Sequence, residues 1–335
     1  MKKHFLSFVF ICIALFNLSC KKSPTEVVDN TQPGRRDYVW TVDTISTDPF
    51  VYITRFWGSA PNDIWAVGGN LFHYDGNKWV EIKTKNPVYP QAVFGFSQND
   101  VWAAGYSKIW HYNGNQWSFF SDHSLPGYHN SFFNRIWGET ANDVYLVGGS
   151  NSDSLGNYKG IVLHYDGIKW NYIDIPELRV AFADVKKSSS KLIFTAYQDE
   201  NNSSTTFFVL EYGGNTFKIL YKGNEVPQLT YLKGNLFVNI GKKVFKYYDG
   251  TLVQFFDFVQ LEYVGGFWGR TEKDFFCVTQ NGLGHYNGTD LATIYNFDIN
   301  KQSPFNGLLF ENEVFFLGRD EQANISIIIK GKLTK

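Results

Sequence analysis

Short runs of Val, Ile, Phe, Tyr and Trp, broken by Gly, Asn and Asp, dominate the chain, and long runs at helical spacing are scarce. The first clear group predicts four strands, at 51–57, at 64–67, at 71–74 and from Trp79 onward. Asp75-Gly76 separates the third strand from the fourth, and this pair is typical of a tight hairpin because glycine supplies positive φ. The pattern therefore predicts an all-β domain of short antiparallel strands.

The same pattern recurs along the chain. In four copies an Asp precedes the second strand and lies six residues after an aromatic residue; these are Asp63, Asp100, Asp143 and Asp274. Three further copies are more divergent, and with them the markers before the second strand fall at 63, 100, 143, 191, 235, 274 and 313. Successive markers are 37 to 48 residues apart, which matches one four-stranded blade of a β-propeller. The sequence therefore predicts a seven-bladed β-propeller.

The two ends of this repeat region are predicted to meet. The last unit stops after its third strand, near Lys335, and lacks a fourth. The segment 38–45 begins Tyr-Val-Trp and resembles the fourth strand at 78–82. We therefore predict that 38–45 pairs with the C-terminal blade and closes the ring, which leaves no open sheet edge on that blade. The propeller is expected to span residues 38–335.

The pattern W-G-x-x-x-N-D-φ-W-A-V-G followed by H-Y-D-G-x-x-W is complete in residues 57–79. It resembles a family of bacterial secreted and lipid-anchored β-propellers, whose members are labelled hypothetical proteins or glucosyltransferases. The Gly-Gly, Tyr and Trp spacing is also similar to kelch repeats. The resemblance covers residues 38–335 and implies the propeller fold. It implies no particular ligand, because the shared residues are the repeating ones.

The N-terminus has the features of a targeting segment. Lysines precede an apolar run at 5–16, which predicts a signal peptide over residues 1–19. Ser19 followed by Cys20 resembles the lipobox of bacterial lipoproteins, so we expect Cys20 to carry lipid. The alternative is an ordinary secretory signal that happens to contain a cysteine. Residues 20–37 are polar and predict a flexible tether. Because Lys21 follows the cysteine, we expect an outer-membrane lipoprotein of a bacterial cell envelope.

Composition narrows the range of partners. The 335 residues carry a formal net charge of −1, which gives no positive surplus for binding nucleic acid. Of the three cysteines, Cys12 would leave with the signal peptide and Cys20 would be lipidated. Cys277 would then be alone, so we expect no intrachain disulfide. We expect a monomer that needs no cofactor.

Histidines occupy one equivalent position in four of the predicted blades: His73, His111, His164 and His285. A catalytic centre needs unlike residues that converge on one point, whereas these are distributed one per blade. We interpret them as hydrogen-bonding strand residues, the repeated Asp residues as turn caps, and the repeated Trp and Phe residues as packing between blades. The alternative, a metal site, requires several ligands in one place, so we expect no metal.

Two arginines interrupt the repeat. Arg55 and Arg135 each lie two residues before a Trp-Gly pair, on the strands predicted to be innermost. The equivalent positions of the other blades are expected at Ala92, Ala183, Pro227, Gly266 and Phe305. The fold does not require arginine there, so we predict that both arginines face the mouth of the central channel and bind a carboxylate. The alternative is that they form internal salt bridges.

Long loops are predicted at one face of the ring, at 83–91, 121–131, 148–160, 197–205, 296–307 and 318–325. Loops on a rigid scaffold are where binding residues concentrate. The candidate contacts within them are Tyr89, His123, Tyr128, His129, Tyr158 and Tyr197. Aromatic surfaces beside polar groups suit a glycan or a protein ligand. The alternative is that these loops are merely variable and solvated.

No nucleophile elbow, zinc-protease motif, phosphate-binding loop or dinucleotide fingerprint is present. The leading hypothesis is therefore a non-catalytic binding module for a glycan or protein. The alternative is a glycan-active hydrolase or lyase, in which two loop carboxylates would cooperate. The candidate carboxylates for that chemistry are Asp199, Glu200, Glu262, Asp320 and Glu321.

Overall fold

Every regular element in the described part of the chain is a β-strand, and the strands form seven four-stranded sheets. The computed structural model describes residues 32–45, 52–84, 89–125, 130–151, 158–200, 204–259 and 262–334. Residues 1–31 and 32–335 form separate units, and the expected signal peptide and Cys20 lie outside the described residues. The described residues contain no helix that is long and apolar enough to cross a membrane.

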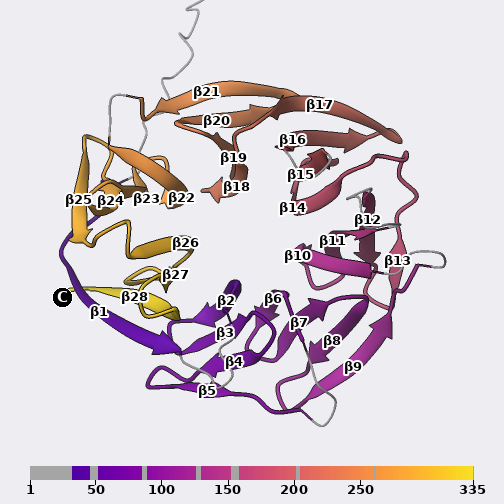
Figure 1. The fold of residues 1–335 in the computed structure, drawn as a ribbon, viewed down its shortest axis with the longest axis horizontal. Coiled ribbons are helices and arrows are strands. Elements are labelled where there is room, and N and C mark those ends of the chain that lie inside the picture. The colour runs from indigo at the N-terminus through magenta and orange to yellow at the C-terminus, as the bar shows by residue number, and fades with distance from the viewer. Residues whose placement is uncertain are drawn as a thin grey trace, which may run out of the picture. The chain divides into compact units, whose positions relative to one another are not determined.

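Each sheet is one blade; in the first six blades the strands follow chain order from the centre of the ring outward, and in the seventh the outermost strand comes from the N-terminus (Figure 1). Blade one contains β2 (Arg55–Ala60), β3 (Asp63–Val67), β4 (Leu71–Tyr74) and β5 (Trp79–Glu81). Blade two contains β6 (Ala92–Ser97), β7 (Asp100–Gly105), β8 (Lys108–Tyr112) and β9 (Trp117–Asp122). Blade three contains β10 (Asn130–Thr140), β11 (Asp143–Asn151), β12 (Tyr158–Tyr165) and β13 (Trp170–Tyr172). Blade four contains β14 (Ala181–Ser188), β15 (Lys191–Glu200), β16 (Ser204–Gly213) and β17 (Thr216–Gly223).

The remaining three blades continue the ring. Blade five contains β18 (Pro227–Leu232), β19 (Asn235–Ile240), β20 (Lys243–Tyr248) and β21 (Thr251–Asp257). Blade six contains β22 (Tyr263–Thr271), β23 (Asp274–Thr279), β24 (Gly282–Tyr286) and β25 (Leu291–Asn296). Blade seven contains β26 (Gln302–Leu309), β27 (Glu313–Asp320), β28 (Ile325–Leu333) and the N-terminal β1 (Tyr38–Ile45). The sequence-based prediction of a seven-bladed propeller is confirmed.

The ring closes as predicted. Strand β1 pairs antiparallel with β28 along its whole length, from Tyr38 opposite Leu333 to Ile45 opposite Ser326 (Figure 1). A strand from the N-terminus therefore completes the C-terminal blade. The last sheet gains its fourth strand from the other end of the domain, so unfolding of either end disrupts the same blade.

The core lies between neighbouring blades. All five residues of β3 are buried, because a second strand has a neighbouring sheet on each side. One apolar cluster joins Trp102 of blade two to Ile161 and Trp170 of blade three. Burying a large apolar side chain contributes about 1.5–3 kcal/mol, so stability is distributed around the ring. The recurrent Trp and Phe residues pack between blades, as the repeat predicts.

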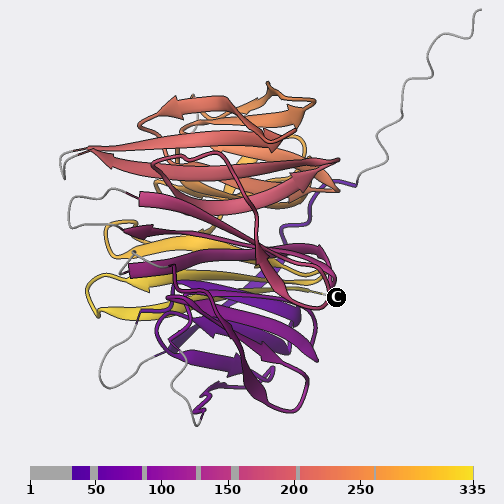
Figure 2. The same ribbon diagram turned by 90° about the vertical axis from the view of Figure 1, so that its right-hand side faces the viewer.

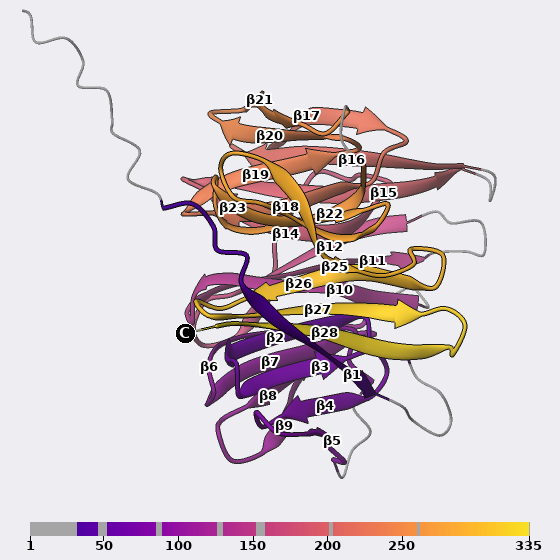
Figure 3. The ribbon, with the colours of Figure 1, turned by 90° about the vertical axis from the view of Figure 1, so that its left-hand side faces the viewer.

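The ring has two unlike faces (Figures 2 and 3). The turn face carries the tight turns between third and fourth strands, in which Asp75 accepts the backbone N–H groups of Asn77 and Lys78 at 2.8 and 2.9 Å. Gly76 in this turn has the positive φ predicted for it, 92°. The loop face is the opposite end, where the chain passes from one blade to the next. Strands β15 and β16 extend toward the loop face, which is at the right of Figure 3.

Residues 32–37 contact the turn face of blade six before the chain enters β1 (Figure 3). The N–H of Gly34 donates to a backbone carbonyl of the turn between β22 and β23 at 3.0 Å. Arg36 reaches both carboxylate oxygens of Asp290 at 3.1 Å and the carbonyl oxygen of His285 at 2.8 Å. These residues were expected to form the end of a tether, and here they dock on the propeller.

Candidate functional site

The four repeated histidines form one hydrogen-bonded pair per blade on the turn face. Each Nε2 lies 2.7–2.8 Å from a carboxylate oxygen of the Asp that starts the second strand of the same blade. In blade one, Asp63 also accepts a hydrogen bond from the hydroxyl of Ser59 near the end of β2, and the His73 ring packs on Trp65 with centroids 4.3 Å apart. The pairs are therefore scaffold. The described residues contain no group of three or more His, Cys, Asp or Glu that could hold a metal ion.

The central channel contains a cavity of about 500 Å³ that is bounded by the innermost strands of six blades. Its polar lining includes Arg55, Arg135, Asp184, Lys186, Gln228 and Asn306. The structure thus brings the two predicted arginines to one cavity. The size is within the range typical of small-ligand sites, about 300–1,000 Å³.

In blades four, five and seven, the residue equivalent to Arg55 and Arg135 lies one position later in the chain than the sequence predicts. The residue that pairs with the fifth position of the second strand is Asp184 in blade four, Gln228 in blade five and Asn306 in blade seven. The sequence had indicated the residue before each. Strands β2 and β10 contain a β-bulge just before the turn, whereas β14, β18 and β26 lack it. One residue fewer before the turn shifts the inward-facing position.

In blade six the structure corrects the expected channel position by one residue in the opposite direction. Gly265, not Gly266, pairs opposite Val278, because β22 contains additional register shifts. Neither glycine carries a side chain into the cavity. The polar side chains of the channel therefore come from the other blades.

Arg135 and Asp184 form a channel ion pair. The Nε of Arg135 lies 3.2 Å from Oδ1 of Asp184, and Nζ of Lys186 lies at the same distance from that oxygen. The N–H of Val185 donates to it as well, at 2.8 Å. Burial disfavours the ionised carboxyl, but Arg135 and Lys186 outweigh it and lower the pKa of Asp184. For Arg135 the alternative of an internal salt bridge is therefore correct.

Arg55 differs, because no carboxylate lies within ion-pair distance of it among the described residues. Its Nη1 donates to the carbonyl of Thr54 at 2.8 Å, and its buried Nε has no hydrogen-bond partner. Burial, followed by repulsion from Arg135, lowers its pKa to about 10, and attraction to Asp184 partly opposes the shift. Arg55 remains protonated at neutral pH. The channel holds three cations against the single carboxylate of Asp184 among its lining residues.

Arg55 also lines a second cavity, of about 510 Å³, toward the loop face. Gln91 and Asn134 contribute polar side chains there, and the Gly68-Gly69 turn forms part of its wall. Arg55 thus lies where the channel meets the loop face. The sequence did not identify Gln91 and Asn134 as candidates. Asn134 immediately precedes Arg135 and is the extra residue of a β-bulge in β10.

The loop candidates fall into separate places. Tyr158 and Tyr197 lie together, with ring centroids 5.6 Å apart, and Tyr158 donates to Asp199 at 2.7 Å. Burial and then the hydrogen bond to Asp199 raise the pKa of Tyr158. Tyr89 is 52% exposed and precedes β6.

The structure describes only one of the two candidate histidines of the 121–131 loop. His123 forms a hydrogen bond with the hydroxyl of Ser121 at 3.0 Å and packs near Tyr172. Tyr128 and His129 lie outside the described residues. Of the predicted contacts, the structure therefore assembles Arg55 with Arg135 and Tyr158 with Tyr197.

Known structures share the fold. The β-propeller domain of Cps50 (Swd1) from Myceliophteria thermophila matches 88% of this chain and all of its own length, with 9% identity and a TM-score of 0.60. The extracellular domain of BT4673 from B. thetaiotaomicron, assigned as a hybrid two component system, matches 88% of this chain with 14% identity and a TM-score of 0.57. The match covers 40% of the length of that extracellular domain. No family profile and no curated protein matches the sequence. At such identities the likeness establishes a β-propeller and no more.

Proposed function

We propose that this protein is a non-catalytic binding module, which takes a carboxylate group of a glycan or protein at the loop-face end of its central channel. The observation that carries this proposal is Arg55. Its guanidinium is part-buried, has no carboxylate partner among the described residues and lines both cavities. A guanidinium presents paired N–H donors that match a carboxylate. A ligand carboxylate would supply hydrogen-bond acceptors for the Arg55 N–H groups that have no partner in the described part of the chain.

The channel electrostatics support binding over hydrolysis. Glycoside hydrolysis by two carboxyl groups requires one acid whose pKa is raised so that it holds a proton. Asp184 is the carboxylate among the lining residues of the central cavity, and its pKa is lowered. Asp199 accepts hydroxyl groups from Tyr158 and Thr205 at 2.7 and 2.8 Å. Asp184 is thus ion-paired and Asp199 is hydrogen-bonded to two hydroxyl groups, so neither arrangement favours a proton donor.

The proposed setting is the bacterial cell envelope, with the propeller attached through lipid on Cys20. The support is the charged and apolar pattern before Cys20, together with the likeness of the fold to a bacterial extracellular domain. The Cys20→Ser variant should leave the membrane fraction when cells are separated into fractions. Unchanged membrane retention would contradict lipidation.

The binding site is tested with an oligogalacturonate, which carries carboxylates, and with its methyl ester, which does not. We expect calorimetric binding of the acid by the full chain, weakened at least about tenfold in Arg55→Gln, since a charge-assisted hydrogen bond contributes about 1.5–3 kcal/mol. Arg135→Gln should have a smaller effect because Asp184 already engages Arg135. Lys108→Gln removes one charge from the exposed start of β8 and is the control.

Two outcomes would contradict the proposal. One is equal affinity of the Arg55→Gln variant and the unmodified chain for the acid. The other is equal binding of acid and methyl ester. Affinity that falls with added salt would support a charge interaction, because dissolved ions screen the attraction between the ligand carboxylate and Arg55.

A further inference from the structure

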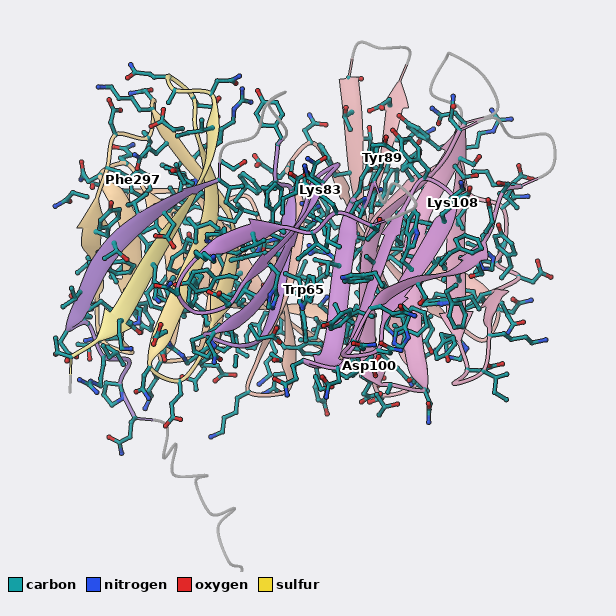
Figure 4. All side chains as sticks on the ribbon, turned by 90° about the horizontal axis from the view of Figure 1, so that it is seen from below. Trp65, Lys83, Tyr89, Asp100, Lys108 and Phe297 are labelled. Atoms are coloured by element: carbon teal, nitrogen blue, oxygen red, sulfur yellow. The ribbon has the colours of Figure 1, made fainter. Side chains whose placement is uncertain are left out.

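A groove of about 640 Å³ lies on the outer wall of the propeller between blades one and two, apart from the channel. Strands β3, β4, β8 and β9 bound it, together with the residues that follow β5. We call this the blade 1–2 groove; its lining includes Trp65, Ile82, Tyr112, Gln116, Trp117 and Phe119. Figure 4 shows Trp65 and, nearer the loop face, Lys83 at its upper end.

The inner part of the groove is built of aromatic rings. Trp65 lies 5.0 Å from Tyr112 and 5.2 Å from Trp117, measured between ring centroids. Trp65 is buried, Tyr112 and Trp117 are half-buried, and Phe119 is 51% exposed. The groove therefore presents aromatic surface that begins in the core and ends at solvent.

The corresponding place between blades two and three is covered. There Trp102, Tyr165 and Trp170 form the same cluster, with Trp102 lying 4.9 Å from Tyr165 and 5.4 Å from Trp170. Phe120 packs on this cluster, 4.9 Å from Trp102. Phe120 is the extra residue of a β-bulge in β9, and its ring, which is 37% exposed, lies over the cluster as a cover.

Blade one lacks this cover. Its fourth strand β5 has three residues, and Ile82 follows it with its N–H bonded to the carbonyl of Leu71 at 2.8 Å. Counted from the tryptophan that starts the fourth strand, Ile82 corresponds to Phe120. Ile82 also packs against the aromatic cluster, but its smaller side chain covers less of it than a phenylalanine ring does. The groove thus forms where Ile82 departs from the residue of the neighbouring blade, just as Arg55 departs from the other blades at its position.

We propose that the blade 1–2 groove binds a neutral oligosaccharide. A sugar ring has an apolar C–H face that packs on aromatic rings and hydroxyl groups at its edges that need polar partners. Asn115, Gln116 and Ser118 are exposed along the groove, and Lys83 supplies one cation. No carboxylate lines it in the described part of the chain. These groups suit hydroxyl-rich ligands, and the site is separate from the proposed carboxylate site.

The test is a glycan array of neutral oligosaccharides probed with the full chain, followed by titration of the bound glycans with tryptophan fluorescence as the readout. We expect at least one neutral glycan to bind and to change the fluorescence, since Trp65 and Trp117 line the groove. Phe119→Ala should weaken that binding about fivefold or more. Ile82→Phe should abolish it by supplying the ring that Phe120 supplies in the next blade.

Thermal unfolding of each variant shows whether it is folded, and Phe119→Ala keeps the test valid if Ile82→Phe is unstable. The Arg55→Gln variant is the control and should bind neutral glycans normally, so this proposal and the channel proposal can fail independently. The proposal is overturned if no neutral glycan binds. It is also overturned if folded Ile82→Phe and Phe119→Ala bind as tightly as the unmodified chain.

Discussion

Blades one and six contain the same histidine–aspartate pair in unlike surroundings. In blade one the side chain of His73 is 27% exposed, whereas that of His285 in blade six is 0% exposed. The Nε2–Oδ1 distances are nearly equal, 2.7 and 2.8 Å. The difference comes from residues 32–37, which cover the blade six pair. The repeat therefore sets the geometry of the pair, and a segment outside the repeat sets its environment.

The close approach depends on Gly34. A Cβ atom at this position would lie 2.7 Å from Oδ1 of Asp274 and from the ring of His285. Only a residue without a side chain can approach so closely without displacing its neighbours. Blade six also has Arg270, whose Nη1 lies 2.9 Å from Oδ2 of Asp274, while the equivalent position of blade one is Ser59. Asp274 is thus shared by the buried His285 and the half-buried Arg270.

The largest expected effect is the loss of that shared carboxylate. Asp274→Ala leaves His285 and the largely buried Arg270 without their partner, so we expect a cost of roughly 3–5 kcal/mol in the free energy of unfolding. Asp63→Ala removes the partner of a more exposed histidine and should cost about 1–2 kcal/mol. Urea denaturation of both variants measures the difference. Equal losses would show that the covering segment does not matter.

The blade pattern was predictable because it is local. Alternating apolar residues, Asp-Gly turns and the Trp that starts a fourth strand recur within each unit, so the number of blades follows from counting units. The closing strand was predictable for the same reason, since 38–45 resembles the one element that the last unit lacks. Its observed pairing with β28 shows that a missing repeat element can be found at the other end of a chain.

The site was only partly predictable, because it depends on register and on distant contacts. Arg55 stood out as a break in the repeat, but the absence from β14 of the bulge before the turn, which the sequence does not reveal, decides that Asp184 rather than Ala183 faces the channel. The open blade 1–2 groove depends similarly on whether a bulge places an aromatic ring over the cluster. The contact between Arg36 and Asp290 joins residues 254 positions apart. No local pattern encodes it.

The second prediction concerns how the stability of the propeller depends on pH. Burial lowers the pKa of His285 below its ordinary value of 6.5, an effect that Asp274 opposes and that Arg36 and Arg270 reinforce. Below pH 6.5 the unfolded chain therefore binds a proton that the folded chain does not, so stability falls as the pH decreases from 6.5 toward the lowered pKa. His285→Gln should reduce the dependence of the free energy of unfolding on pH in this window.

The matched control is His73→Gln, since His73 holds the equivalent strand position with a side chain that is only partly buried. Urea midpoints measured at pH 7 and pH 5 give the comparison. We expect the change in slope to be larger for the blade six variant. An equal change in both variants, or none in either, would contradict the role assigned to burial.

The smallest effect is expected at the edge of the covering segment. Asp290 binds Arg36 in blade six, whereas the equivalent residue of blade one is Lys78. Asp290→Lys gives blade six the residue of blade one and opposes Arg36 with a like charge. Because the Asp290 side chain is 58% exposed, solvent screens the pair, and we expect a loss of no more than about 1 kcal/mol.

Trypsin provides a more sensitive measurement, because cleavage after Arg35 or Arg36 requires the segment to leave the blade. Asp290→Lys should accelerate that cleavage severalfold, and added salt should diminish the difference by screening the charges. The reverse exchange, Lys78→Asp, alters blade one, where no described residue corresponds to Arg36, and it should leave cleavage unchanged. If Asp290→Lys is cleaved no faster than the unmodified chain, the ion pair between Arg36 and Asp290 does not hold the segment, and the two blades differ by shape and not by charge.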